Sequence, residues 1–291
     1  MIAENLYPLL SFVPAGVLAV AVKAWRWFRR NGELRPPTEE KYLPSPGDSC
    51  RKKIDELDEE IGGLVIYLFV LPPVIATWYL LVGKSRYAAG IWSWAPSAAM
   101  LMFCFVWLCC RYFALVKQRE NWRLGFNGER LVGQILNRLM LEGCQVFHDF
   151  SLASNWNLDH IVVAPSGVYA IETKMRSKGP RSHWQKAHEV IYDGDVLQFP
   201  RHRNTEFLTQ ARRQAELLAT LLKDVLEGSH VQAVVTLPGW YVLTQGSGEV
   251  LVLNPRMLQS AILGNHPAVL STQQIMKIAR RLEREHREDA L

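Results

Sequence analysis

The sequence predicts an α/β (or α+β) domain in which a mixed sheet is flanked by helices, preceded by a helical region embedded in a membrane. The first 116 residues are dominated by long apolar runs and hold six of the ten Trp. From residue 121 the apolar residues are spaced as in a soluble domain, in the order helix, three strands, helix, strand. The formal charge of +5 permits a polyanionic partner without requiring one.

Three apolar runs predict membrane-spanning helices. The first, at 8–22, is short, but Lys23 and the aromatic residues after it extend it, which gives a first segment over 1–30. A signal peptide is the alternative for this segment, although its positive charges follow the apolar core instead of preceding it. The second and third runs, at 62–82 and 91–113, predict a hairpin over 62–116.

The distribution of Lys and Arg predicts an orientation. They are concentrated in the linker at 31–61 with its flanks and after residue 116, while only Lys84 and Arg86 lie between the second and third runs. The positive-inside rule therefore places the linker and the soluble domain in the cytoplasm, with the bilayer of a bacterial inner membrane as a partner. No span carries a carboxylate or His near its middle, which argues against an ion pathway or a proton-coupled transporter.

The soluble domain is predicted over 121–255, with a helical extension at 256–291. Asn127 is a candidate N-cap for a helix over 128–140. Two apolar strands around the turn Ala164–Gly167 predict a hairpin over 157–174. Ser271 with Gln274 predicts a capping box for the last helix. The remaining predicted elements are a strand at 145–152, a hairpin at 188–199 turning at Asp193-Gly194, a helix at 204–226 ending at Gly228, and strands at 231–237 and 250–253.

Three charged residues interrupt the apolar strands of the 157–174 hairpin. Glu172 and Lys174 share one face of their strand, about 7 Å apart. If Val163 pairs with Val168, Asp159 falls opposite Glu172. Charges are rarely buried without a partner or a metal, so this group favours a functional site. The alternative is a simple salt bridge between Glu172 and Lys174 on a half-exposed strand.

Three short stretches resemble the NERD (nuclease-related) domain, a branch of the PD-(D/E)xK nuclease superfamily. They are Gly128-Glu129, Asn157-Leu158-Asp159-His160-Ile161, and Gly167-Val168-Tyr169-Ala170-Ile171-Glu172-Thr173-Lys174, and the resemblance covers roughly 121–240. It implies a restriction-endonuclease-like αβββαβ core. It also implies site roles for Asp159, Glu172, Lys174, Glu129 and Gln210. The stretch Asn204-Thr205-Glu206-Phe207 departs from the Asn-Pro pair that often precedes this Gln in the family.

The residue types fit the hydrolysis of phosphodiesters. The carboxylates of Asp159, Glu172 and Glu129 are oxygen ligands of the kind that Mg²⁺ or Mn²⁺ prefers, and such a metal activates water. The ammonium of Lys174 can stabilise developing charge. Glu129 as a surface residue in a first helical turn and Gln210 as a plain surface residue are the alternatives. His160 is expected on the other strand face, as a packing residue, and the five Cys show no disulfide or zinc spacing.

The sequence therefore predicts a membrane-anchored, metal-dependent nuclease that acts on DNA or RNA. A catalytically inactive nucleic-acid-binding or adaptor module is one alternative, and a protein whose membrane hairpin carries the main function is another. Trp156 and Trp184 are candidates for stacking on bases, with loop or core packing as the alternative. A basic rim that contacts phosphates, or else a solvated charged face, is formed by Arg176, Lys178, Arg181, Arg201, Arg203, Arg212 and Arg213.

Overall fold

The computed structural model describes residues 43–86, 95–152, 156–178, 188–264 and 267–288. These residues divide into two compact units. One consists of Asp55–Glu120, and the other of residues up to Ile54 together with those from Asn121 onward. The predicted first membrane segment at 1–30 lies outside the described residues.

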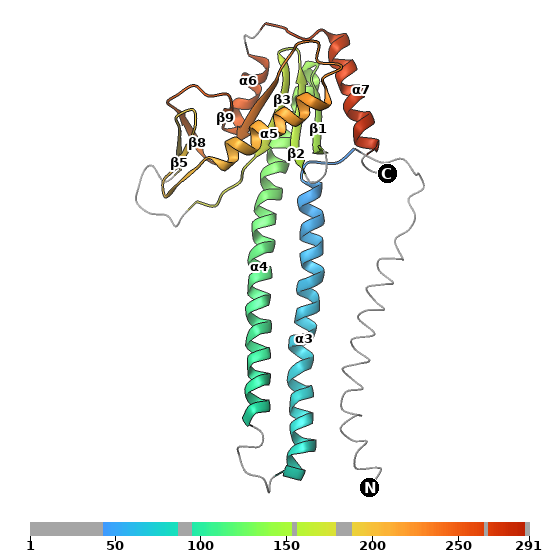
Figure 1. Ribbon diagram of the computed structural model, residues 1–291, viewed down its shortest axis with the longest axis vertical. Coiled ribbons are helices and arrows are strands. Elements are labelled where there is room, and N and C mark those ends of the chain that lie inside the picture. The colour runs from blue at the N-terminus through green and yellow to red at the C-terminus, as the bar shows by residue number, and fades with distance from the viewer. Residues whose placement is uncertain (1–42, 87–94, 153–155, 179–187, 265–266, 289–291) are drawn as a thin grey trace. The chain divides into compact units, whose positions relative to one another are not determined.

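Two long helices contribute residues to both units (Figure 1). Helix α3 runs over Asp48–Arg86 and helix α4 over Ala95–Asn137. The prediction that a helix begins at Asn127 is wrong, because α4 is already helical for many residues before it. The ten residues before Asn127 contain no proline, so nothing interrupts the backbone hydrogen bonds there.

Within the described residues, no helix is long and apolar enough to cross a membrane, so the predicted spans at 62–82 and 91–113 are not supported. The apolar runs are parts of helices of 39 and 43 residues, and other turns of these helices are strongly charged. Arg111 pairs with Glu60 at 2.7 Å, and Arg119 pairs with Asp58, so polar contacts join the two helices in this unit. Hydropathy reveals an apolar run but not the ends of the helix that contains it.

The other unit is built on a mixed five-stranded sheet in the order β1-β2-β3-β7-β9. Its first three strands are antiparallel, and β7 and β9 are parallel to β3. Val163 pairs with Val168, as predicted, and Ala164 pairs with Gly167, which leaves a two-residue turn. The strands are β1 (Gln145–Ser151), β2 (Asn157–Ala164), β3 (Gly167–Thr173), β7 (Val231–Thr236) and β9 (Leu251–Leu253).

A smaller four-stranded sheet has the order β6-β5-β4-β8. The predicted hairpin that turns at Asp193-Gly194 is confirmed as β4 (Glu189–Tyr192) and β5 (Leu197–Phe199). Strands β6 (His202–Asn204) and β8 (Tyr241–Thr244) were not predicted. Each has only three or four residues, and β6 is entirely polar, so neither carries an apolar alternation that identifies a strand.

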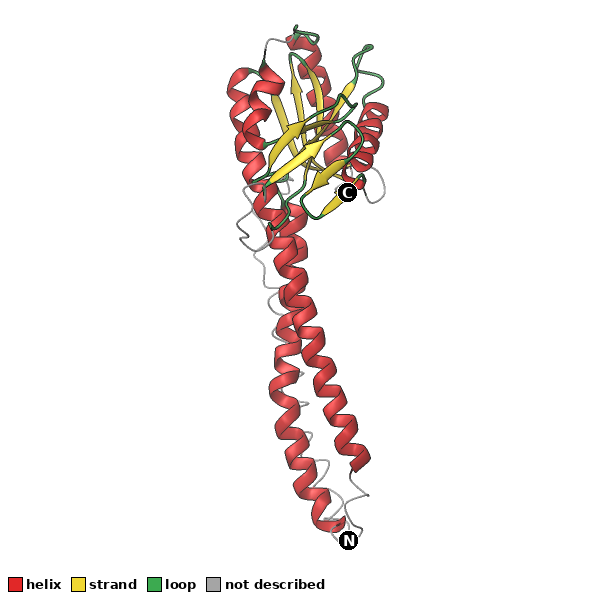
Figure 2. Cartoon of the chain, turned by 90° about the vertical axis from the view of Figure 1, so that its left-hand side faces the viewer, coloured by secondary structure: helices red, strands yellow, loops and turns green. Residues whose placement is uncertain are grey.

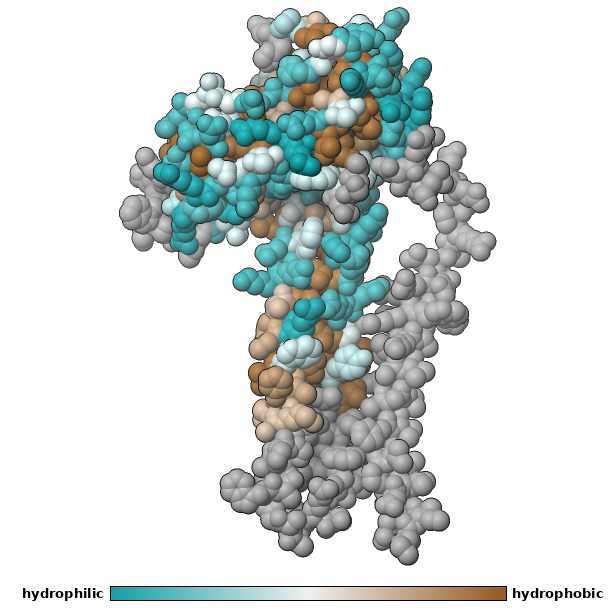
Figure 3. Space-filling model, in the orientation of Figure 1, coloured by the Kyte–Doolittle hydropathy of each residue, from teal (hydrophilic) through white to brown (hydrophobic). Residues whose placement is uncertain are grey.

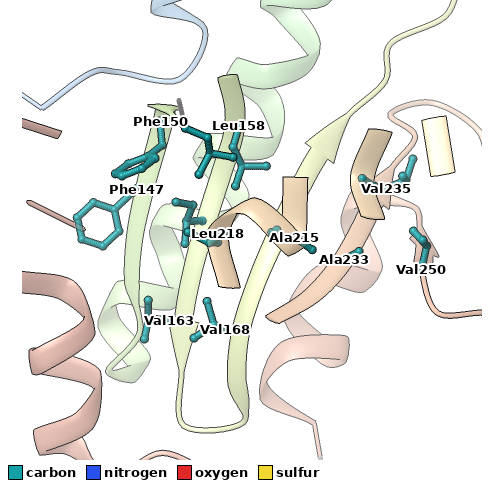
Figure 4. Packing of buried hydrophobic residues seen from close by; sticks show 14 of the residues in the cluster. Phe147, Phe150, Leu158, Val163, Val168, Ala215, Leu218, Ala233, Val235 and Val250 are labelled. Carbon is teal, nitrogen blue, oxygen red and sulfur yellow. The ribbon is translucent and has the colours of Figure 1, made fainter. Parts of the chain in front are cut away.

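Helices cover both faces of the larger sheet (Figure 2). On one face, α5 (Glu206–Leu221) and α7 (Thr272–Glu288) pack over the apolar side chains of the strands; Figure 4 shows Leu218 and Ala215 of α5 beside Leu158, Val163 and Val168. The capping box of Ser271 and Gln274 begins α7, with hydrogen bonds of 2.8 and 3.3 Å. Helix α5 ends earlier than predicted, at Leu221, and Gly228 belongs to the turns that follow.

On the other face, the C-terminal part of α4 buries Val132 and Leu136 against Val162 and Tyr169. The short helices η3 (Arg138–Glu142), η4 (Pro255–Met257) and α6 (Leu258–Leu263) complete this layer. The larger unit is therefore a mixed α/β fold with sheets flanked by helices. Helices α4 and α5 lie on opposite faces of the larger sheet.

Candidate carboxylate and lysine site

Three acidic residues occupy neighbouring positions across β1, β2 and β3. In the β1–β2 pairing, His148 lies opposite His160 and Phe150 lies opposite Leu158. The residues between them, Asp149 on β1 and Asp159 on β2, therefore face each other. The β2–β3 register likewise carries Asp159 to the position opposite Glu172, as the sequence predicted. The left-handed backbone of Asp149, with φ of 50°, interrupts the regular alternation of β1 at this point.

Glu172 is 3 % exposed, and both of its carboxylate oxygens have partners. Oε1 accepts a hydrogen bond from Gln210 Nε2 at 2.8 Å and lies 2.5 Å from Lys174 Nζ. Oε2 accepts a hydrogen bond from Gln214 Nε2 at 2.6 Å. The salt bridge offered as an alternative is thus present. It lies on a buried carboxylate that three side chains hold in place, whereas the alternative assumed a half-exposed strand.

Asp159 is half-buried, and its Oδ2 accepts a hydrogen bond from the backbone N–H of Thr173 at 2.7 Å. Burial raises the pKa of Asp159 well above its ordinary value, and the nearby charges of Glu172 and Glu129 raise it further. The Thr173 hydrogen bond and the charge of Lys174 oppose this shift. Asp159 therefore lies near two other carboxylates, Glu172 and Glu129, and near one cation, Lys174.

Glu129 comes from α4 and is 7 % exposed, so the alternative that made it a surface residue is wrong. Its Oε1 accepts a hydrogen bond from the Cys50 thiol at 3.0 Å, while its Oε2 is buried and has no partner among the residues that the structure describes. Burial is the main cause that raises the pKa of Glu129 to about 7, and the charges of Asp149 and Glu172 add to it. At neutral pH this side chain is divided between its acid and its carboxylate form.

The residues around the start of α3 cover the Glu129 side of the cluster. The backbone N–H of Ser49 donates to Asp149 Oδ2, and the Asn157 side-chain amide donates to Asp149 Oδ1. Gly47 has φ of 83° and packs so closely that an added Cβ would lie 2.7 Å from the Phe126 ring. Cys50 itself is buried, and this burial raises the pKa of its thiol.

A buried histidine pair lies beside the acids. His148 Nδ1 is 2.8 Å from His160 Nδ1, and His148 Nε2 is 2.8 Å from Asn137 Oδ1. His160 is fully buried, and burial lowers the pKa of both rings. The prediction that His160 packs rather than reacts agrees with this position.

The sequence missed three residues of the cluster: Cys50, Asp149 and Gln214. Gln214 lies four residues after Gln210, so helical spacing alone placed it on the same face. No local pattern marks the other two. Asp149 depends on an unusual backbone conformation, and Cys50 reaches Glu129 from 79 positions earlier in the chain.

The predicted basic rim is only partly described. Arg181 and Trp184 lie outside the described residues. Arg212 faces Glu249 and Asp195, so its charge is engaged by carboxylates. Arg213 lies over the ring of Trp156, 5.3 Å from its centroid.

Among the residues that the structure describes, no group of three or more His, Cys, Asp or Glu side chains has the arrangement of a metal site. The donor types nevertheless suit a hard divalent cation, because Glu129, Asp159 and Glu172 all supply carboxylate oxygens. Glu129 Oε2 is an acceptor to which no residue in the described ranges donates a hydrogen bond. Lys174 Nζ lies where a cation on Glu172 Oε1 would otherwise lie.

Comparison with known families supports the resemblance seen in the sequence. Residues 124–238 match the model of the nuclease-related domain, NERD. Searches of curated proteins and of solved structures gave no match. The matched range contains Glu129, Asp159, Glu172, Lys174 and Gln210, whereas Cys50 lies before it. A nuclease-related domain therefore occupies residues 124–238 of this chain.

Proposed function

We propose that this domain is a metal-dependent nuclease that hydrolyses phosphodiester bonds of DNA or RNA. The observation that carries the proposal is the buried Glu172, which is held at both oxygens beside two further carboxylates and a lysine. Gathering like charges in this way costs stability, and proteins retain such clusters chiefly where they perform chemistry. The match to a nuclease-related domain and the restriction-endonuclease-like order of α4, β1–β3, α5 and β7 support it.

Mg²⁺ or Mn²⁺ would be held by Asp159, Glu172 and Glu129, and when bound it would polarise a phosphoryl oxygen and make a coordinated water more acidic. Lys174 neutralises Glu172 in the structure described here. Once its ammonium is released from Glu172, it can stabilise charge on a phosphate. Gln210 and Gln214 keep the Glu172 carboxylate oriented.

The test is cleavage of labelled DNA and RNA by the purified full chain with Mg²⁺ or Mn²⁺. We expect cleavage that stops when a chelator is added and that is lost in Glu172→Gln. Glu142→Gln is the matched control, because Glu142 is an exposed acid of η3, and it should retain full activity. Undiminished cleavage by Glu172→Gln would contradict the proposal.

A second candidate is a nucleic-acid-binding or adaptor module without catalysis. It is favoured by the 2.5 Å contact of Lys174 with Glu172, which compensates this carboxylate without a metal. This function predicts salt-sensitive binding of nucleic acid that a chelator leaves unchanged, and no cleavage with either metal. The same assay therefore separates the two candidates.

We also propose that the chain is an integral protein of a bacterial inner membrane, with the domain at 121–255 in the cytoplasm. In the described parts of α3 and α4, large apolar side chains are exposed to an extent unusual for a helix pair in water: Phe69 is 78 % exposed and Phe103 is 70 % exposed. Figure 3 shows apolar residues on the surface of this part of the helices. Recovery of the full chain in the membrane fraction after an alkaline wash is the expected result. Release into the supernatant would contradict it.

A further inference from the structure

We infer that the site receives single-stranded nucleic acid, whose bases and phosphates lie along a row of alternating cationic and aromatic side chains that starts at Lys174. This inference rests on the proposed function, since it names the form of nucleic acid that reaches the carboxylates. The row, called here the stacking row, consists of Lys174, Phe207, Arg176, Phe199 and His202.

The members of the stacking row contact one another in sequence. Lys174 Nζ lies 5.4 Å from the centroid of the Phe207 ring. The Arg176 guanidinium lies 5.4 Å from the centroids of both Phe207 and Phe199, so it bridges the two rings. The His202 ring stacks on Phe199 with centroids 4.7 Å apart and planes inclined by only 4°.

One end of the row is part of the carboxylate cluster. Lys174, its first member, is also the residue that contacts Glu172 at 2.5 Å. A strand lying along the row would therefore bring its phosphates to Glu172 and Asp159. The exposed ring of His202 would then stack on a base, while Lys174 and Arg176 contact phosphates, and together they would fix the position of the phosphate that reacts.

The row is rigid on its inner side and open on its outer side. Phe199 is 6 % exposed and Trp240 is 5 % exposed, and their rings meet edge to face at 5.2 Å. The Trp240 indole N–H also donates to the backbone carbonyl of Arg176 at 3.4 Å. His202, by contrast, is exposed at the start of β6. The buried rings of Phe199 and Trp240 thus support the ring of His202, whose outer side is exposed.

The chemistry of the row selects an unpaired strand. Arginine and lysine contact phosphates of any nucleic acid, but a flat ring can stack only on a base whose face is free. In a duplex those faces are covered by the neighbouring base pairs. The two residues on either side of His202 are the exposed Arg201 and Arg203, so further cations flank the outer ring.

The electrostatics of His202 agree with a stacking role. Loss of hydration lowers the pKa of this ring, and the charge of Arg176 lowers it further. A neutral imidazole at pH 7 binds through its face, while the adjacent guanidinium supplies the positive charge. The contact of Arg176 with the ring nitrogens of His202 holds the two groups together.

The test is binding of fluorescently labelled oligothymidylate by the full chain in the presence of a chelator, compared with a duplex of the same length. We expect the single strand to bind at least about tenfold more tightly. His202→Ala should weaken single-strand binding by about 5- to 150-fold, the range that corresponds to the loss of one base–aromatic stack. His202→Phe should restore the affinity, because phenylalanine again supplies an aromatic ring at this position and carries no charge.

His230→Ala is the matched control, since His230 is exposed in the loop before β7, at the other end of that strand from Thr236. Its affinity should equal that of the unaltered chain. Equal affinity for single strand and duplex would overturn the inference. So would unchanged binding in His202→Ala with a thermal melt identical to that of the unaltered chain.

The outcome is separable from that of the proposed function, because binding is measured without catalysis. Ring-dependent binding of the single strand together with no cleavage under Mg²⁺ or Mn²⁺ would support the inference and refute the nuclease. Glu172-dependent cleavage without any preference for single strands would refute the inference and leave the nuclease standing.

Discussion

Gln214 donates a hydrogen bond to Glu172 Oε2 at 2.6 Å, and the same amide nitrogen lies 2.8 Å from the carbonyl oxygen of Asn157. It therefore ties helix α5 both to the buried carboxylate on β3 and to the first residue of β2. Gln210, one turn earlier, contacts only the other oxygen of Glu172. Gln214 is fully buried and Gln210 is half-buried, so loss of the Gln214 amide should cost more stability than loss of the Gln210 amide.

Gln214→Leu should lower the free energy of unfolding by about 1–3 kcal/mol, because it leaves a buried carboxylate oxygen and a carbonyl without their donor. Cleavage should fall more strongly, since the Glu172 carboxylate loses one of the groups that orient it. Urea denaturation and an initial-rate assay measure the two effects. Gln210→Leu is the paired variant and should cost less stability. Equal effects for the two variants would count against a special role for Gln214.

Glu129 should make stability depend on pH. Its pKa is raised from 4.5 to about 7 in the folded chain, so between these values the folded state holds a proton that the unfolded state has released. Stability contributed at this residue is therefore lost as the pH rises from about 4.5 to about 7 and is constant above. Glu129→Gln should remove this loss, which amounts to about 3 kcal/mol.

The measurement is the urea midpoint of the unaltered chain and of Glu129→Gln at several pH values. The difference between them should grow up to about pH 7 and then level off. Metal-dependent cleavage by the unaltered chain should rise through the same range, because only the ionised carboxylate binds a cation. A difference that does not vary with pH would show that Glu129 is not the titrating group.

The stability of Asp149 variants should depend on how well the new residue tolerates a left-handed backbone. With φ of 50°, it occupies a region where glycine is comfortable and alanine is strained by about 1 kcal/mol. Both Asp149→Gly and Asp149→Ala remove the carboxylate that accepts from Ser49 and Asn157. We therefore expect the alanine variant to be less stable than the glycine variant by about 1 kcal/mol in thermal or urea unfolding. The reverse order would mean that the left-handed conformation is not kept in solution.

Cys50 should resist alkylation in the folded protein. Its side chain is buried, and burial together with the nearby carboxylates raises the pKa of the thiol, so little thiolate forms. The same chain unfolded in urea is the reference. Brief treatment with a maleimide followed by peptide mass spectrometry should label Cys50 much more slowly in the folded chain than in the unfolded chain. Labelling of Cys50 at the same rate would show that the residues around the start of α3 leave the site freely.

The hairpin of β2 and β3 could be predicted because its residues determine it locally. Two apolar strands and a short turn fix the register from Val163 and Val168, and this register brings Asp159 toward Glu172. The same reasoning was wrong at Asn127, where a good capping residue lies inside a helix that began 32 residues earlier, at Ala95. A capping residue permits a helix to start but does not require it to.

The rest of the site depends on contacts between distant parts of the chain. Cys50 reaches Glu129 only because the start of α3 and the C-terminal part of α4 belong to the same compact unit. Phe199 contacts Arg176 only because a small second sheet forms. The membrane spans were read from hydropathy, which does not record the charged turns that continue the same helices. Contacts between residues close together in the sequence could be predicted, whereas contacts between distant segments of the chain could not.

The two hydrogen bonds from α5 to Glu172 fix the number of residues between Gln210 and Gln214 more strictly than they fix which residues these are. Gln210 and Gln214 hold one carboxylate from successive turns, and each residue of a helix rotates the chain by about 100°. Of the three residues between them, Ala211 is buried in the core, whereas Arg212 and Arg213 are at least partly exposed and open to substitutions that keep the helix. Deleting or inserting a single residue there would turn one amide away from the sheet, so we expect relatives of this domain to vary in sequence at this point of α5 but not in spacing.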